Sequence, residues 1–232
     1  MINVLDLSKK FSDKIVIDKL NLFVNSGEIV ALVGKNGAGK STLIRLISGL
    51  LKADSGKFEF AENARIGVLL GGDINLYGNL SGYEVIHYFG KLYGIDTKTI
   101  DKKIDDLDKE LNFKSFFKNR TATFSRGMRQ KIAIVISVIH EPDILLLDEP
   151  STGLDIEASN DVIKFIEYLK KQNKTILIAT HNIFEISDLS DRIAFIDNGK
   201  IIQTVDTKQY FKGCTQGEKS KKLILSMEGT KT

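Results

Sequence analysis

A glycine-rich segment, GKNGAGKS at residues 34–41, combines two lysines and a hydroxyl side chain with three glycines. It follows the apolar segment EIVALV and precedes TLIRLISGL, so we expect it to join a strand to the start of a helix. In such a loop, backbone N–H groups and the helix N-terminus bind phosphate oxygens, Lys40 reaches the outer phosphates, and Ser41 binds magnesium. A glycine-rich turn with a chance lysine is the alternative, but it does not account for both flanking segments. The segment therefore predicts a phosphate-binding P-loop.

Charged side chains end two other apolar segments. ILLLDE ends in Asp148 and Glu149, and TILIAT is followed by His181. Charges at the end of a buried strand need a metal ion or cations to offset their desolvation. We expect Asp148 to bind magnesium together with Ser41, and Glu149 to act as a general base on the attacking water. We expect His181 at the same sheet edge, where it can hydrogen-bond the terminal phosphate. Solvated acidic caps are the alternative if the carboxylates stand alone.

A second candidate phosphate site is FSRGMRQK, residues 124–131. Ser125 suits a helix N-cap, and Gly127 in the first turn leaves room for a backbone N–H to approach an anion. Arg126 places a positive charge in a first turn, where the helix dipole disfavours it, so helix stability alone does not explain this residue. The alternative is a capped helix with a basic first turn. The sequence leaves open what Arg126 contacts.

The elements that position these residues follow from hydrophobic periodicity. Alternating patterns predict strands at 2–7, 14–24, 28–33, 57–60 and 65–70, with a helix at 41–50 among them. A 3.6-residue period predicts helices at 83–94, 99–113 and 127–140, which form an inserted helical subdomain over about 72–139. The last third predicts strands at 143–148 and 175–180, a helix at 156–172, and a hairpin of 193–197 and 200–205 around Asn198-Gly199.

Strand, helix and strand in that order predict parallel strands with right-handed crossovers. The predicted fold class is therefore α/β: a P-loop NTPase core with a mainly parallel sheet, an N-terminal antiparallel β subdomain and the inserted α-helical subdomain. The lysine-rich tail, 213–232, is expected to be poorly ordered or weakly docked. His87 and His140 fall in the predicted helices, and we expect both to be partly exposed and without a functional role.

Composition limits the classes of function. The chain is 42% apolar and 27% charged, which is typical of a globular protein. Its net charge of +3 lies in the tail, because six Lys and three Asp or Glu follow position 205. This balance disfavours a basic nucleic-acid groove. The chain has one cysteine, its start lacks an apolar secretion signal, and its longest apolar run, IAIVISVI, is too short to cross a bilayer, so we expect a cytoplasmic location.

Taken together, the P-loop, FSRGM, ILLLDEP, STGLD and the later histidine resemble the ATPase domain of ABC transporters in order and spacing, over residues 1–212. The resemblance implies ATP and Mg²⁺ as cofactors, with Asp148 as the Walker B residue, Glu149 as the catalytic glutamate and His181 as the switch histidine. It implies that Phe11 stacks on adenine. The remaining nucleotide-binding residues that it implies are Gly34, Lys35, Asn36, Gly37, Ala38, Gly39, Lys40, Ser41 and Thr42 of Walker A, and Ser125 and Gly127 of the signature.

The family's signature closes over the ATP held by the P-loop of a partner in a head-to-tail dimer. The resemblance thus implies a homodimer with ATP sandwiched between its subunits, bound to the inner face of the cell membrane through a separately encoded permease. The S-R-G-M version of the signature resembles the subfamily paired with ABC-2 type export permeases. One departure is Gly71-Gly72-Asp73, which stands where the family has a Q-loop glutamine. Gln130 lies on a different predicted helix and is not an evident replacement.

Two other classes of function remain as alternatives. A soluble ABC-type ATPase can act as a mechanical switch on nucleic acid or ribosomes, but such relatives carry two cassettes or a long coiled coil, and this chain has neither. A nucleotide-binding module without turnover gains weight from the absent Q-loop glutamine, whereas Glu149 and His181 argue against it. We therefore expect an ATP-hydrolysing transporter subunit, of an exporter rather than an importer.

Overall fold

The computed structural model describes residues 1–71 and 76–228, and their fold is α/β as predicted. The central sheet has the strand order β5-β6-β7-β3-β8-β9. All neighbours in it pair in parallel except β8 and β9. Its strands are β3 (Ile29–Val33), β5 (Ile66–Leu69), β6 (Ile144–Asp148), β7 (Thr175–Ala179), β8 (Arg192–Asp197) and β9 (Lys200–Asp206).

The three middle strands β3, β6 and β7 are buried at every position. Continuous apolar strands of this kind are typical of a parallel sheet that is covered on both faces. Leu32 of β3 and Asp148 of β6 both lie opposite Ala179 of β7, so the three strands end at one sheet edge. The P-loop, Glu149 and His181 follow these strand ends, and the topology therefore brings them together.

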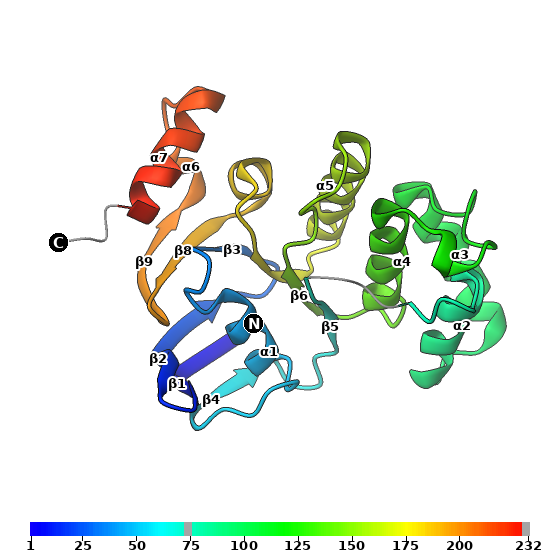
Figure 1. Cartoon of the computed structure of the whole chain (residues 1–232), viewed down its shortest axis with the longest axis horizontal. Helices are drawn as coiled ribbons and strands as arrows, with labels where there is room; N and C mark the ends of the chain where they lie inside the picture. Colours follow the sequence, from blue (N-terminus) through cyan, green and yellow to red (C-terminus); the bar gives the residue numbers. More distant parts are fainter. Residues whose placement is uncertain (72–75, 229–232) are drawn as a thin grey trace.

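A separate antiparallel sheet covers one end of the molecule, with the order β2-β1-β4 (Figure 1). Its strands are β1 (Ile2–Phe11), β2 (Lys14–Val24) and β4 (Ser55–Phe60). Its apolar residues and α1 (Lys40–Ile47) form a core on one face of the parallel sheet. This arrangement confirms the predicted N-terminal β subdomain.

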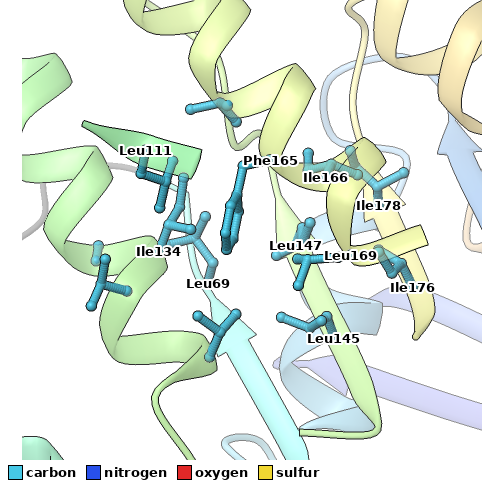
Figure 2. Close-up of a cluster of buried hydrophobic side chains, with 14 of the residues drawn as sticks. Leu69, Leu111, Ile134, Leu145, Leu147, Phe165, Ile166, Leu169, Ile176 and Ile178 are labelled. Atoms are coloured by element: carbon cyan, nitrogen blue, oxygen red, sulfur yellow. The ribbon is translucent and has the colours of Figure 1, made fainter. Parts of the chain in front are cut away.

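A second core lies on the opposite face of the parallel sheet, beneath α4 (Arg126–Val138) and α5 (Ile156–Lys171). Phe165 of α5 is fully buried at its centre, between Ile134 of α4 and Leu147 of β6 (Figure 2). Truncating such a side chain to alanine costs about 3–5 kcal/mol. This core holds α4 on the sheet and thereby fixes the position of the FSRGM segment at the N-terminus of α4.

The helices α2 (Gly82–Leu92), α3 (Thr97–Leu111) and α4 group at the other end of the molecule (Figure 1). Ser81 and Glu84 form a reciprocal capping box that starts α2. The predicted exposure of two histidines is wrong: His87 is 8% and His140 5% exposed. His87 Nε2 lies 2.9 Å from Asp101 of α3, and the His140 ring stacks on Tyr93 at 3.9 Å. His87 thus lies between α2 and α3, and His140 lies between Tyr93 and Ile66 of β5, which local periodicity does not reveal.

The C-terminal segment is also more structured than predicted. After the β8–β9 hairpin, where Asn198 and Gly199 have the expected positive φ, the chain forms α6 (Thr207–Tyr210) and α7 (Gln216–Glu228). Leu223 of α7 is 3% exposed in the second core, and the Tyr210 hydroxyl donates to the carbonyl of Lys222. The segment 216–228 is therefore helical, and Leu223 is its one buried residue among those whose side chains are described, whereas the sequence predicted a poorly ordered or weakly docked tail. No helix within residues 1–71 and 76–228 has the length and apolar character needed to cross a membrane.

Candidate nucleotide-binding and catalytic site

The P-loop is held between the two sheets. Gly39, the N-cap of α1, has a φ of 109°, and a Cβ built on it would lie 2.8 Å from Ile17 of β2. Only glycine fits both restrictions. Lys40 is buried and donates to the carbonyl oxygens of Gly34 at 2.7 Å and Lys35 at 3.1 Å. Burial lowers the pKa of the Lys40 ammonium, and the charges of Glu149 and Asp148 oppose that shift.

Ser41 and Asp148 meet at the start of α1. The Ser41 hydroxyl donates to Asp148 Oδ1 at 3.0 Å, and Asp148 is 3% exposed. A hydroxyl and a carboxylate are hard oxygen ligands of the kind that Mg²⁺ uses beside substrate phosphates. The structure therefore joins the predicted metal pair from residues that are 107 positions apart, and their chemistry fits the ion.

Glu149 and His181 form a second pair at the same sheet edge. His181 Nδ1 lies 3.0 Å from Glu149 Oε1, and the Thr152 hydroxyl donates to Oε2 at 2.6 Å. Glu149 has a φ of 51°, which a non-glycine residue adopts only when its surroundings hold it there. Its backbone N–H donates to Ala179 of β7 at 2.8 Å. The carboxylate is thus fixed in place, as a general base must be.

The FSRGM segment starts α4 as predicted, since Ser125 Oγ accepts from the N–H of Met128 at 3.2 Å. No hydrogen bond or ion pair within the described residues joins Ser125, Arg126 or Gly127 to the P-loop. Gly127 has a role inside the chain that the sequence did not reveal. A Cβ built on it would lie 2.9 Å from the Cβ of Ala158 in α5.

Arg126 lies against the STGLD segment, residues 151–155. A Cβ built on Gly153 would lie 2.4 Å from Nη1 of Arg126, and Gly153 has a φ of 72°. The guanidinium group therefore fills the space that a side chain at Gly153 would need. This contact answers the question that the sequence left open about Arg126.

Phe11 lies at the end of the β1–β2 hairpin and is 46% exposed. The same hairpin packs on the P-loop, because Gly39 approaches both Val16 and Ile17. Phe11 is thus an exposed aromatic residue of the hairpin whose second strand contacts the P-loop, and its role in base stacking stays a prediction.

The Q-loop departure is only partly within the described residues, because Gly72 and Asp73 lie outside them. The φ of Gly71 is not in the positive range that favours glycine, so its backbone does not demand that residue. A Cβ built on it would instead lie 3.0 Å from the carbonyl oxygen of Asp148. Close approach to the backbone carbonyl of Asp148 is therefore the physical reason for a small residue here.

The sequence assigned no role to three residues near the site. Gln130 of α4 is buried and donates to the carbonyl of Pro150 at 2.6 Å, and Asn182 donates to Ser151 Oγ at 3.0 Å. Glu185 is fully buried four residues after His181. Glu185 lies four residues before the apolar Leu189, so both fall on one helix face. This spacing was the one signal in the sequence that Glu185 is buried. Burial raises the pKa of the Glu185 carboxyl group, and the hydroxyls of Ser151 and Thr180 oppose the shift.

A protein-family model described as ABC transporter matches residues 17–152. The chain belongs to the ABC transporter family. It is 40% identical to the ABC transporter ATP-binding protein NatA of Bacillus subtilis, over 87% of this chain and 88% of that protein. It is 34% identical to the lantibiotic transport ATP-binding protein SrtF of Streptococcus pyogenes, over 87% and 89%, and 34% identical to the bacitracin transport ATP-binding protein BcrA of Bacillus licheniformis, over 88% and 69%.

Solved structures agree with this assignment. An ATP-binding subunit of an ABC transporter superimposes with a TM-score of 0.83 at 26% identity, covering 97% of this chain and 99% of that one. The MJ0796 cassette, described as dimeric and bound to ADP and Pi, superimposes with a TM-score of 0.80 at 21% identity, covering 89% and 99%, and shows the shared fold. This ABC protein is thus an ATP-binding and ATP-hydrolysing transporter subunit. The expected activity and fold are confirmed.

Proposed function

We propose that two copies of this ABC protein bind two ATP molecules between them and drive a separately encoded membrane permease. The observation that carries the proposal is that two predicted phosphate-binding segments, the P-loop and the FSRGM segment, are separate within one chain. The P-loop lies with Asp148 and Glu149, whereas Ser125 at the capped N-terminus of α4 is exposed and has no bond to that site. A second copy can place its Ser125 and Gly127 on the ATP of the first, as the dimeric form of a related cassette suggests.

Within each site, the residues of this chain have distinct roles. Lys40 and the P-loop N–H groups bind the outer phosphates, and Phe11 stacks on the base. Ser41 and Asp148 would hold Mg²⁺, which would supply positive charge beside the phosphates. Glu149 accepts a proton from the attacking water. His181 fixes the position of that carboxylate relative to the terminal phosphate. These are the assignments that the family resemblance implied, and the geometry described above supports them.

An exposed apolar patch offers a surface for the permease. Four large side chains on α2 and its flanks are between 46% and 65% exposed: Tyr77, Tyr88, Leu92 and Tyr93. Clusters of large apolar side chains on a surface commonly mark protein interfaces. The protein would then be peripheral on the inner face of the cell membrane. Relatives named for lantibiotic and bacitracin transport favour export of a compound over the nucleic-acid alternative.

Mixed dimers test the shared site. One chain carries Lys40→Ala and the other carries Ser125→Asp, both in a Glu149→Gln background so that bound ATP is not consumed. Aspartate still caps α4 but directs a negative charge at the phosphates, whereas the control Ser125→Asn caps the helix without charge. Each homodimer should trap no ATP. The mixed dimer should trap one ATP per dimer, and a mixed dimer that traps none would contradict the proposal.

A further inference from the structure

Glu185 is a buried acid without a counterion. Its side chain is fully buried at the start of a π-helical segment, Glu185–Leu189. Among the residues that the structure describes, no ion pair includes it, and neither carboxyl oxygen has a partner in good hydrogen-bond geometry. A buried carboxylate without a cation is disfavoured, so burial favours the neutral form of this group. Single π-helical turns are also concentrated at functional sites.

The neighbours of Glu185 connect it to the catalytic pair. The hydroxyls of Ser151 and Thr180 lie beside its carboxyl group. Ser151 Oγ accepts from the Asn182 side chain, and Thr180 Oγ1 accepts from the Asn182 backbone N–H, each at 3.0 Å. Both hydroxyl oxygens therefore accept from Asn182, and their hydrogens remain available to the carboxyl group of Glu185.

These contacts join the two segments that carry the catalytic side chains. Ser151 lies two residues after Glu149, and Thr180 and Asn182 flank His181. The distance between Glu149 and His181 thus depends on how segment 149–151 sits against segment 180–182. We propose that Glu185 is a positioning residue whose buried carboxyl group, by hydrogen bonding and not by charge, links Ser151 to Thr180 and thereby sets the Glu149–His181 pair. In this role Glu185 does not contact ATP. It acts on ATP hydrolysis indirectly, and it lies outside the sequence motifs.

Two substitutions at one position separate this role from simple packing. Glu185→Gln keeps the size and the hydrogen-bonding groups of a neutral acid, whereas Glu185→Leu keeps the volume and removes both polar atoms. Glu185→Leu should lower kcat for ATP hydrolysis by about tenfold or more with an unchanged Kd for ATP, because a misplaced catalytic pair affects turnover and not binding. Glu185→Gln should restore kcat to within about threefold of wild type. Thermal unfolding tests whether each variant is folded.

Two results would overturn the proposal. Wild-type kcat in Glu185→Leu would show that the carboxyl group positions nothing. An equal loss in both variants would show that an ionised carboxylate is required. If Glu185→Leu does not fold, Ser151→Ala removes the other end of the same link and should lower kcat without changing the Kd for ATP. Normal turnover in Ser151→Ala would then refute the proposal. The kcat of each variant is compared with that of wild type, so the test does not depend on the proposed dimer or permease.

Discussion

The guanidinium group of Arg126 lies over Gly153, in the space that a side chain at position 153 would occupy. The start of α4 and the segment that follows Glu149 are therefore in contact within one chain. The basic residue in the first turn serves this contact, although the helix dipole disfavours it. Arg126 thus has an intrachain role that does not require it to touch nucleotide.

Replacing Arg126 with glycine should therefore leave ATP trapping nearly intact. In a Glu149→Gln background, we expect the amount of trapped ATP to stay within about threefold of the parent, because exposed charged contacts contribute about 0–1 kcal/mol. Filter binding of labelled ATP measures it. A loss beyond tenfold would mean that Arg126 turns toward the phosphates.

Gly127 is constrained by Ala158 of α5, not only by a nucleotide. Gly127→Ala should lower stability by about 1–3 kcal/mol, because its new methyl group meets the Ala158 Cβ. Thermal unfolding measures the effect, and Ala158→Gly serves as the second arm of a double-mutant cycle. In the Ala158→Gly background, the same change at Gly127 should cost much less. An equal cost in both backgrounds would show that the two residues do not compete for space.

His181 is bonded to Glu149 and its side chain is 62% exposed. His181→Ala should lower kcat by about 100-fold or more, since a positioned catalytic group contributes about 10²–10⁴-fold. Its unfolding temperature should change little, because an exposed side chain contributes little packing. Phosphate release and thermal scans report both quantities. Unchanged turnover would remove His181 from the catalytic site.

His140 predicts a pH dependence of stability. Burial lowers the pKa of its imidazole in the folded protein, and its Nε2 lies 3.0 Å from the Ile66 carbonyl. The unfolded chain therefore binds the proton more readily, so this contribution to stability is complete above the unfolded pKa of about 6.5 and is lost as the pH falls below it. Between pH 7.5 and 5.5, the unfolding temperature of wild type should fall about 2–4 °C more than that of His140→Gln, which corresponds to about 1 kcal/mol. Parallel curves would contradict this role.

The sequence predicted those parts of the fold that local patterns determine. The second predicted strand, 14–24, has the same bounds as β2, and the P-loop, the Ser125 cap and the Asn198-Gly199 turn lie where expected. These features depend on alternation, glycine and capping chemistry within a few residues. Spacing and order along the chain also sufficed to predict that Ser41 lies close to Asp148, because parallel strands end at a common edge.

Pairwise contacts between distant segments could not be predicted in this way. The burial of His87 and His140 depends on partners in other elements, and the space left by Gly127 is defined by a helix that starts 29 residues later. The tail looked polar enough to be disordered, but Leu223 of α7 is buried in the core and Met227 packs against that core. Each of these outcomes requires knowledge of the neighbour in space.

Glu149→Gln tests the catalytic account most directly. The substitution removes the carboxylate that we propose as the general base, and it leaves Lys40, Ser41 and Asp148 unchanged. The variant should bind ATP with the Kd of wild type, release no phosphate above background, and elute as a dimer when ATP is present. Equilibrium titration, phosphate release and gel filtration on the same preparation measure the three quantities. Persistent hydrolysis by a monomeric variant would contradict both the role of Glu149 and the proposed ATP-bound dimer.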